Sequence, residues 1–332
     1  MTRVAVIGVG SMGKNHARVY NQLPEAQLVA VTDTNQQTSR SIGELYGVPS
    51  FDSYIEMIEK EKPEAVSIAV PTALHCEVAL ETLQREVHIL LEKPIAATIE
   101  EGQRITEAAR KTKCVLMVGH VVRFNSAHQE LKQKLDADEL GRVYQIFCRR
   151  TGPFPNRIRD VGVVIDLATH DVDIMRFLTG MEPKRVYAEI EQRIHTEHED
   201  LLFGLFRFPD NITGALEINW LTPTKVREVF VLGERGMFRV DDLLQDLYFY
   251  ENAQITNDLW AGLRNLKGVS EGSMTRFALH RNEPLETELR AFLKAVRGES
   301  PVPVSGEDGL AALRLALSLI ESGREHKVVE LG

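Results

Sequence analysis

Short apolar runs alternate with longer amphipathic stretches over the first 121 residues. The runs are residues 3–7, 28–32, 65–70, 87–91 and 115–118, and helical spacing of apolar residues fills the intervals between them. The periodicity predicts helices over residues 38–46, 52–60 and 99–111. Buried strands that alternate with helices are typical of a doubly wound parallel sheet. We therefore predict an α/β Rossmann domain over residues 1–121.

The pattern changes after residue 121. A helix is predicted over residues 126–135, a long strand over 142–151 and one helix over 163–178 that ends at Gly180. About five strands with alternating polarity then follow one another to residue 250, without helices between them. Consecutive strands of this kind indicate an antiparallel sheet. We predict an α+β domain over residues 122–332 with a large, open, mostly antiparallel sheet.

The C-terminal region has two clear patterns and one weak one. Helices are predicted over residues 286–296 and 306–323. Residues 252–281 have the least regular pattern in the chain, which predicts a loop or lid.

Composition narrows the class of protein. A chain of 332 residues is long enough for two domains, and its net charge of −9 argues against a general nucleic-acid surface. No run of about 18 apolar residues predicts a membrane span, and the N-terminal apolar run is too short for a signal peptide. Cys76, Cys114 and Cys148 lack the spacing of a zinc site or disulfide framework. We expect reduced thiols in a cytoplasmic protein without a metal.

A glycine-rich turn follows the first predicted strand and precedes a helix. Its sequence, Gly8-Val9-Gly10-Ser11-Met12-Gly13, has the G-x-G-x-x-G spacing of a dinucleotide-binding loop. Gly8 makes the tight turn, Gly10 lets a pyrophosphate approach the backbone, and Gly13 lets the helix pack close to the strand. We predict that Gly8, Gly10, Ser11, Met12 and Gly13 bind the cofactor; a glycine turn without a ligand is the alternative.

Asp33 ends the second predicted strand, 20 residues after Gly13. A carboxylate at this place accepts hydrogen bonds from both ribose hydroxyls and repels a 2′-phosphate, so the sequence favours NAD over NADP. Arg40 leaves the second possibility open, because it could approach a 2′-phosphate. Asp33 could also act as a helix N-cap.

Further candidates follow the ends of other strands, at the edge where ligands bind to parallel sheets. We predict that Pro71, Thr72, His75, Glu92 and Lys93 line the cofactor site, and that His120 and Arg123 bind substrate. Pro94 stiffens the turn after Lys93, and we predict a cis bond between these two residues. A surface loop with an ordinary lysine is the alternative.

The predicted helix over residues 163–178 has polar residues at helical spacing. Asp166 and His170 are four residues apart, which places them on one face, and Asp173 continues the stripe. An imidazole oriented by an acid can take a hydroxyl proton near neutral pH. A solvated face or a core histidine would also fit this spacing. One histidine with acids, without a second histidine or a cysteine, is a weak set of ligands for a metal ion.

Arg157 and Arg159 lie two residues apart in a proline-containing segment before this helix. In an extended segment both side chains point the same way, and arginine pairs bind phosphate well. We predict that they bind an anionic group such as a nucleotide diphosphate; ordinary surface arginines are the alternative.

Three motifs together give the chain a family resemblance. The glycine loop, Glu92-Lys93-Pro94 and Asp166-x-x-x-His170 resemble the motif series of the glucose–fructose oxidoreductase/inositol dehydrogenase (Gfo/Idh/MocA) family. The resemblance implies that Lys93, Asp166 and His170 form the catalytic group. It also implies that NAD(P) binds the Rossmann domain, that a sugar or polyol binds the second domain, and that the outer face of the open sheet forms homodimers or homotetramers.

A narrower resemblance comes from residues 118–125 and 152–163. These segments resemble UDP-N-acetylglucosamine 3-dehydrogenases, although that subgroup more often has Glu where this chain has Val122. The implied reaction oxidises the 3-hydroxyl of a nucleotide sugar, with His170 as base, Asp166 orienting it and Lys93 stabilising the alkoxide. Lys93 as the base is the rival. The same motifs would also suit a free-polyol or aldose dehydrogenase, a reaction without net redox change, or a non-catalytic NAD(H)-binding regulator.

Overall fold

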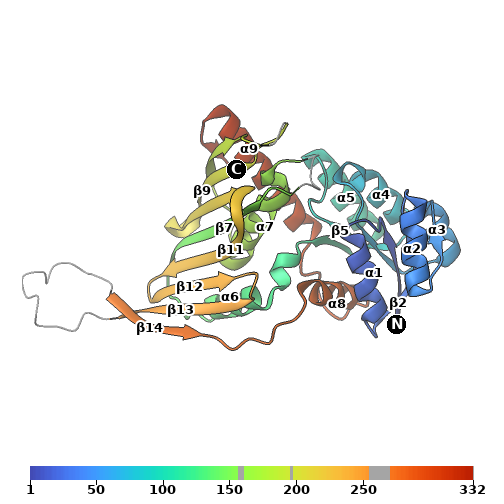
Figure 1. The fold of residues 1–332 in the computed structure, drawn as a ribbon, viewed down its shortest axis with the longest axis horizontal. Helices are drawn as coiled ribbons and strands as arrows, with labels where there is room; N and C mark the ends of the chain where they lie inside the picture. Colours follow the sequence, from blue (N-terminus) through green and yellow to red (C-terminus); the bar gives the residue numbers. More distant parts are fainter. Residues whose placement is uncertain (156–160, 195–196, 254–269, 332) are drawn as a thin grey trace, which may run out of the picture. The chain divides into compact units, whose positions relative to one another are not determined.

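A computed structural model describes residues 1–155, 161–194, 197–253 and 270–331. The chain divides into two compact units (Figure 1). The first contains Met1–Phe124 and Asn282–Leu315, and the second contains Asn125–Arg281 and Ala316–Gly332. The predicted boundary at residue 121 lies close to this division. The C-terminal region differs from the prediction, because its first part belongs to the N-terminal unit.

The first unit is built on a six-stranded parallel sheet, as predicted. Its strands are β1 (Thr2–Ile7), β2 (Ala26–Thr32), β3 (Ser50–Phe51), β4 (Ala65–Ile68), β5 (His88–Glu92) and β6 (Leu116–Gly119), in the order β3-β2-β1-β4-β5-β6. The central strands are apolar and buried almost throughout. The sequence did not predict β3, which has only two residues and so shows no pattern.

Helices flank this sheet. They are α1 (Gly13–Gln22), α2 (Gln36–Tyr46), α3 (Tyr54–Glu61), α4 (His75–Leu83), α5 (Ile99–Thr112) and α8 (Pro284–Val296), with the 3₁₀ turns η1 (Thr72–Leu74) and η2 (Val121–Phe124). α1 contacts α2 and α8, whereas α4 contacts α3 and α5. Ion pairs from Arg18 to Glu283 and from Arg290 to Glu25 hold α8 to this unit. These contacts explain why residues 282–315 group with the Rossmann domain.

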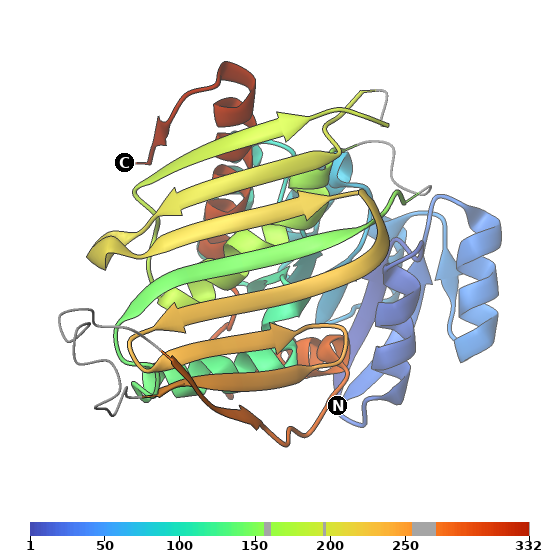
Figure 2. The same ribbon diagram turned by 60° about the vertical axis from the view of Figure 1, so that its left-hand side comes forward.

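The second unit contains a nine-stranded sheet, whose broad face is seen in Figure 2. Its strands are β7 (Val143–Pro153), β8 (Arg185–Glu191), β9 (Leu201–Arg207), β10 (Thr213–Asn219), β11 (Leu221–Gly233), β12 (Gly236–Asp241), β13 (Asp246–Ala253), β14 (Ser270–Arg276) and β15 (Val329–Glu330). The order is β14-β13-β12-β11-β7-β10-β9-β8-β15. Among the described strands of this sheet, only β7 and β10 pair in parallel, so the predicted mostly antiparallel sheet is confirmed.

The loop predicted over residues 252–281 is partly wrong. β13 continues to Ala253, and residues 270–276 form β14, which pairs antiparallel with β13. β14 lies at the edge of the sheet, and its polar, glycine-containing sequence lacks the apolar pattern that would predict a strand. Residues 254–269 lie outside the described part of the chain.

The two faces of this sheet differ in burial. Along β7, Ile146, Cys148 and Arg150 are buried, whereas Phe147 and Arg149 point to the opposite face. The helices of this unit are α6 (Ser126–Asp136), α7 (Thr169–Thr179) and the second half of α9 (Gly306–Glu325), with the 3₁₀ turn η4 (Pro209–Asn211). α7 contacts β7, and α6 contacts β12 and β13, so helices cover the face that carries Arg150.

The helix predicted over residues 163–178 is not regular. Its first turn, η3 (Val164–Ala168), is a π-helical turn, and α7 begins at Thr169. Glu199 anchors this turn through two hydrogen bonds. Its main-chain carbonyl accepts from the Val163 amide, and its carboxylate accepts from the Val164 amide. Gly180 ends α7 in the left-handed region at φ 65°, as predicted from the sequence.

Candidate active site

The glycine loop connects β1 to α1. Gly8 has φ +83°, and a Cβ there would lie 2.8 Å from the Ala69 carbonyl oxygen. A Cβ on Gly13 would lie 1.8 Å from the Gly8 carbonyl oxygen, so both glycines are required by the chain itself. A Cβ on Gly10 would meet nothing within 4 Å. Gly10 thus leaves open surface beside the loop, as a loop that cradles a pyrophosphate requires.

Asp33 lies at the end of β2 beside this loop. Its Oδ2 accepts a hydrogen bond from the Val9 amide at 2.9 Å, and its Oδ1 accepts one from the Asn35 amide at 2.9 Å. The N-cap of α2 is Asn35, whose side chain accepts from the Thr38 amide. The interpretation of Asp33 as an N-cap is therefore wrong. The carboxylate is fixed against the glycine loop, where the ribose of a dinucleotide would lie.

Two hollows open near Asp33 on the surface of the first unit. One, of about 370 Å³, is lined by Val9, Gly10, Lys14, Gln37, Thr38, Ser41 and Ile42. The other, of about 580 Å³, includes Arg40 among its lining residues. Both lie beside α2, so Lys14 and Arg40 are cations within the neighbourhood of the predicted cofactor site. Lys14 was not predicted, because in the sequence it looks like one surface lysine among many.

Lys93 follows β5 at the carboxyl edge of the parallel sheet, with Pro71 and Thr72 in the turn that follows β4. The Lys93–Pro94 bond is cis, as predicted. His75 supports this turn, since its buried ring lies 2.9 Å from the Pro94 carbonyl oxygen and 3.0 Å from that of Val70. Burial lowers the pKa of His75. Both ring nitrogens of His75 thus lie against main-chain carbonyls, and the ring supports the turn that contains Lys93 and Pro94.

Glu92 begins a hydrogen-bonded series that the sequence did not reveal. Its Oε1 lies 3.0 Å from His16 Nε2, His16 Nδ1 lies 3.0 Å from Ser67 Oγ, and Ser67 Oγ lies 2.9 Å from Tyr20 Oη. A carboxylate only accepts, so His16 Nε2 donates to Glu92. In the neutral ring Ser67 donates to His16, and Tyr20 then donates to Ser67. We call these four residues the His16 chain.

The electrostatics of Glu92 follow from this chain. Burial acts to raise the pKa of Glu92, but His16 and Lys93 outweigh it and the pKa is lowered. Glu92 therefore remains an anion, and its Oε2 accepts a hydrogen bond from the Lys93 amide at 3.2 Å. Glu92 thereby links the His16 chain to the main chain of Lys93.

Glu288 of α8 is a second buried carboxyl group in this unit. Its side chain is fully buried, and neither carboxyl oxygen has a hydrogen-bond partner among the described residues. Burial, and then the charge of Glu92, raise the pKa of Glu288 well above its usual value. Burial therefore favours the protonated, neutral form of Glu288 in the folded protein.

The residues predicted to bind substrate lie in different surroundings. Arg123 is buried, and its guanidinium donates to Asp308 Oδ1 at 3.2 Å and to the Pro303 carbonyl at 3.4 Å. These contacts hold the start of α9, and substrate binding by Arg123 stays a prediction. His120 is buried at the end of β6. Arg157 and Arg159 lie outside the described residues.

Asp166 and His170 are both half-buried. Asp166 lies in the π turn and His170 in the first turn of α7. Asp173, predicted on the same stripe, is instead buried, with its Oδ1 3.9 Å from Arg176 Nη1. The π turn widens the helix and shifts the stripe, because it places more than 3.6 residues in one turn.

A buried group of charges lies next to this helix, which the sequence did not predict. Arg150 Nε donates to Asp171 Oδ2 at 2.6 Å, and its Nη2 donates to Asp242 Oδ2 at 3.1 Å. Asp242 Oδ1 lies 2.6 Å from His128 Nε2. Burial acts to raise the pKa of Asp242, but His128 and Arg150 outweigh it, so the pKa is lowered. We call Arg150, Asp171, Asp242 and His128 the Arg150 cluster.

Neither a metal centre nor a membrane span is formed by the residues that the structure describes. Among them, no group of three or more His, Cys, Asp or Glu side chains is arranged to hold a metal ion. In the same part of the chain, every helix is too short or too polar to cross a bilayer.

Two family models match most of the chain. Residues 2–120 match the oxidoreductase family with an NAD-binding Rossmann fold, and residues 128–239 match the GFO/IDH/MocA C-terminal domain. The chain belongs to the GFO/IDH/MocA oxidoreductase family. Its first unit is an NAD-binding domain, which confirms the cofactor predicted from the glycine loop.

Individual relatives agree with this membership. The chain is 28% identical over 320 residues to the UDP-N-acetylglucosamine 3-dehydrogenase of Acidithiobacillus ferrooxidans, covering 96% of each chain. A structure of that enzyme has a TM-score of 0.84 and covers 97% of both chains. The rhizopine catabolism protein MocA of Rhizobium meliloti is 30% identical over 330 residues, covering 96% of this chain and 94% of the relative. The myo-inositol 2-dehydrogenase of Thermotoga maritima is 25% identical, covering 99% of this chain and 98% of the relative.

Proposed function

We propose that this protein is an NAD-dependent dehydrogenase that oxidises a secondary hydroxyl of a sugar, namely the 3-hydroxyl of a UDP-N-acetylhexosamine or a related nucleotide sugar. The observation that carries the proposal is Lys93 at the carboxyl edge of an NAD-binding Rossmann sheet, in a turn fixed by Glu92 and His75. Asp166 and His170 would complete the catalytic group from the second unit.

The fit of the first unit to the cofactor supports this proposal. Gly10 leaves the loop surface open, and Asp33 is fixed beside it by the Val9 amide. When bound, NAD accepts a hydride from the carbon that carries the hydroxyl. A carboxylate at the position of Asp33 favours NAD over NADP. Arg40 of α2 lines a hollow near Asp33, so the preference for NAD is tested by comparing the two cofactors.

Each catalytic residue has a distinct role in this reaction. His170 takes the hydroxyl proton, as an imidazole can near neutral pH. Asp166 orients His170 or binds a neighbouring hydroxyl. Lys93 donates a hydrogen bond to the oxygen as negative charge develops on it. With the hydroxyl proton on His170 and the hydride accepted by bound NAD, the oxidised carbon would become a ketone.

The substrate class is supported by relatives of two kinds. The UDP-N-acetylglucosamine 3-dehydrogenase of Acidithiobacillus ferrooxidans is similar over nearly the whole chain, which favours a nucleotide sugar. The myo-inositol 2-dehydrogenase of Thermotoga maritima is similar at 25% identity and makes a free polyol the second candidate. For a nucleotide sugar we keep the prediction that Arg157 and Arg159 bind the diphosphate and that His120 lies at the substrate site.

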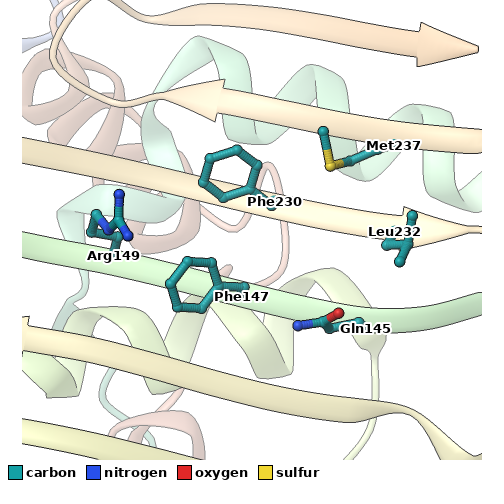
Figure 3. A pocket seen from close by; sticks show the side chains of 6 residues that line it. All are labelled: Gln145, Phe147, Arg149, Phe230, Leu232 and Met237. Atoms are coloured by element: carbon teal, nitrogen blue, oxygen red, sulfur yellow. The ribbon is translucent and has the colours of Figure 1, made fainter. Parts of the chain in front are cut away.

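We also propose that the protein forms a homodimer or homotetramer through the outer face of the nine-stranded sheet. Figure 3 shows a hollow on this face, of about 310 Å³, lined by Gln145, Phe147, Arg149, Phe230, Leu232 and Met237. Farther along the same sheet, Phe203 and Leu205 are about half exposed. Exposed apolar side chains on a broad surface support association. The free thiols Cys76, Cys114 and Cys148 support a reducing, cytoplasmic location.

The decisive experiment follows NADH absorbance across UDP-sugars, inositols and aldoses, with NAD and NADP compared on the best substrate. We expect a UDP-N-acetylhexosamine to be oxidised best. Lys93→Ala and His170→Ala should each lower kcat by roughly 10²–10⁴-fold, since each removes a positioned acid–base group.

Lys60→Ala and His326→Ala are matched controls, because both side chains are largely exposed. They should leave kcat unchanged. Normal turnover by both catalytic variants would contradict the assignment of Lys93 and His170. Faster turnover of inositol than of every nucleotide sugar would favour the second candidate.

A further inference from the structure

His16 of α1 lies in the interior of the first unit, two hydrogen bonds away from Lys93. Its side chain is fully buried, so His16 acts through its neighbours and not on a ligand. Both ring nitrogens contact polar groups at 3.0 Å, Glu92 on one side and Ser67 on the other. An apolar side chain would satisfy packing at a fully buried place in a helix. Packing alone therefore does not explain an imidazole here.

Glu92 ends β5 and is confined by neighbours on both sides. Its Oε1 accepts a hydrogen bond from His16, and its Oε2 accepts one from the Lys93 amide at 3.2 Å. Gly119 of β6 pairs with Glu92 in the sheet, and a Cβ there would lie only 3.3 Å from Oε2. The lack of a side chain at Gly119 therefore leaves the carboxylate the space in which it meets the Lys93 amide.

The hydrogen bond from His16 stabilises both the charge and the orientation of Glu92. Burial raises the pKa of this carboxyl, and the strongest effect that lowers the pKa is the hydrogen bond from His16. Because the Glu92 side chain is 12% exposed, a carboxylate without that donor can turn toward water. Such a rotation would move Oε2 away from the Lys93 amide. A catalytic group keeps its geometry only when the residues that support it are themselves held by packing and hydrogen bonds.

We propose that His16 is a positioning residue, which fixes Glu92 by donating to it and thereby holds the Lys93 turn in the geometry that catalysis requires. The inference rests on the proposed role of Lys93 in the dehydrogenase and adds a residue that acts through Glu92. A displaced Lys93 ammonium would stabilise the developing negative charge on the substrate oxygen less well. NAD binding by the glycine loop and Asp33 does not use this hydrogen bond, so the loss should fall on kcat.

The first test compares His16→Gln with His16→Asn and His16→Leu. The amide nitrogen of glutamine has about the reach of His16 Nε2 and can still donate to Glu92, whereas asparagine is one methylene shorter and leucine has no donor. Leucine leaves no buried amide unpaired, so it replaces His16→Asn if that variant does not fold. We expect kcat to fall by about 10–100-fold in His16→Asn and His16→Leu, with the KM for NAD unchanged, and to recover largely in His16→Gln.

Tyr20→Phe is the matched control within the His16 chain. It removes the hydroxyl that contacts Ser67 and leaves the contact between His16 and Glu92 in place. Its melting temperature should fall while kcat stays at the wild-type value. Loss of kcat in proportion to stability in all these variants would give His16 a structural role only and overturn the inference. A KM for NAD that rises as kcat falls would overturn it too, because the change would then act through the glycine loop.

A second measurement requires no substrate. The Lys93 amide is protected from hydrogen exchange while Glu92 accepts its proton, so NMR exchange at this amide reports the contact directly. Exchange should be about 10-fold faster in His16→Asn and His16→Leu than in His16→Gln. Equal exchange in the three variants would overturn the inference alone. Absence of NAD reduction by every sugar tested would instead contradict the proposed function, and the exchange rates would still test whether His16 positions Lys93.

Discussion

The His16 chain and the Arg150 cluster are both buried polar groups, but they are built differently. The His16 chain is a series of hydrogen-bonded side chains that ends on one carboxylate, Glu92. The Arg150 cluster is built on the guanidinium of Arg150 and two carboxylates, with contacts of 2.6–3.1 Å that include His128. In the His16 chain each residue hydrogen-bonds to the next, whereas in the Arg150 cluster one guanidinium donates to two carboxylates. Removing one member should therefore cost far more in the cluster, because a charge is left without its partner.

The largest effect is expected from Asp171→Ala. This change removes the shortest contact of the buried Arg150, and both side chains are at most 6% exposed. We expect the free energy of unfolding to fall by about 3–5 kcal/mol, measured by urea denaturation. The matched control is Asp136→Ala in α6, which breaks the exposed ion pair with Lys132 and should cost less than about 1 kcal/mol. Equal losses in the two variants would show that the cluster does not depend on its charges.

A smaller effect is expected from Ser67→Ala in the His16 chain. The substitution leaves His16 Nδ1 and the Tyr20 hydroxyl without their partner, both in buried side chains. The free energy of unfolding should fall by about 1–3 kcal/mol in the same measurement. Ser39→Ala, which removes a buried hydroxyl that donates to the Gln36 carbonyl within α2, is the control. If Ser67→Ala destabilised more than Asp171→Ala, the contrast between the two groups would be wrong.

The smallest effect, and one of opposite sign, is expected from Glu288→Gln. The folded state keeps Glu288 protonated because burial raises its pKa, whereas the unfolded chain loses the proton near its usual value of 4.5. The unfolded state thus binds fewer protons above that pH, and the wild type loses stability as pH rises. Glu288→Gln removes this loss and should melt a few degrees higher at pH 8.

The gain from Glu288→Gln should shrink to nothing as pH falls toward 4. Glu286→Gln, on the same helix, is the control, since that side chain is 43% exposed and paired with Arg290. A gain that persists unchanged at pH 4 would show that ionisation of Glu288 is not its source.

Much of the fold could be predicted because its signals are local. The parallel strands are continuous apolar runs, and the residues at their ends, such as Asp33 and Lys93, are found simply by where each run stops. β3 and β14 were missed because one has two residues and the other has a polar edge sequence. The π turn that begins at Val164 was missed because a four-residue spacing looks the same in either kind of helix.

The buried networks could not be predicted, because their partners lie far apart in the sequence. Arg150, Asp242 and Arg227 each resemble surface charges until strand register and the packing of α7 bring them together. The same limitation applies to Arg123, for which the position after β6 did not indicate an ion pair. Its acid, Asp308, comes from a helix near the C-terminus. Sequence spacing locates groups at strand ends but does not identify their tertiary partners.

β7, the strand that carries Arg150, has β10 on one side and β11 on the other. Both neighbours follow it only after α7, β8 and β9, so β7 cannot pair with its neighbours through a short hairpin. Non-local pairing of this kind requires long loops to close first and is slow. During synthesis, β7 must therefore wait, with at least one edge unpaired, until β11 has been made. We therefore expect the Arg150 cluster, which also contains Asp242 beyond β12, to assemble late in folding.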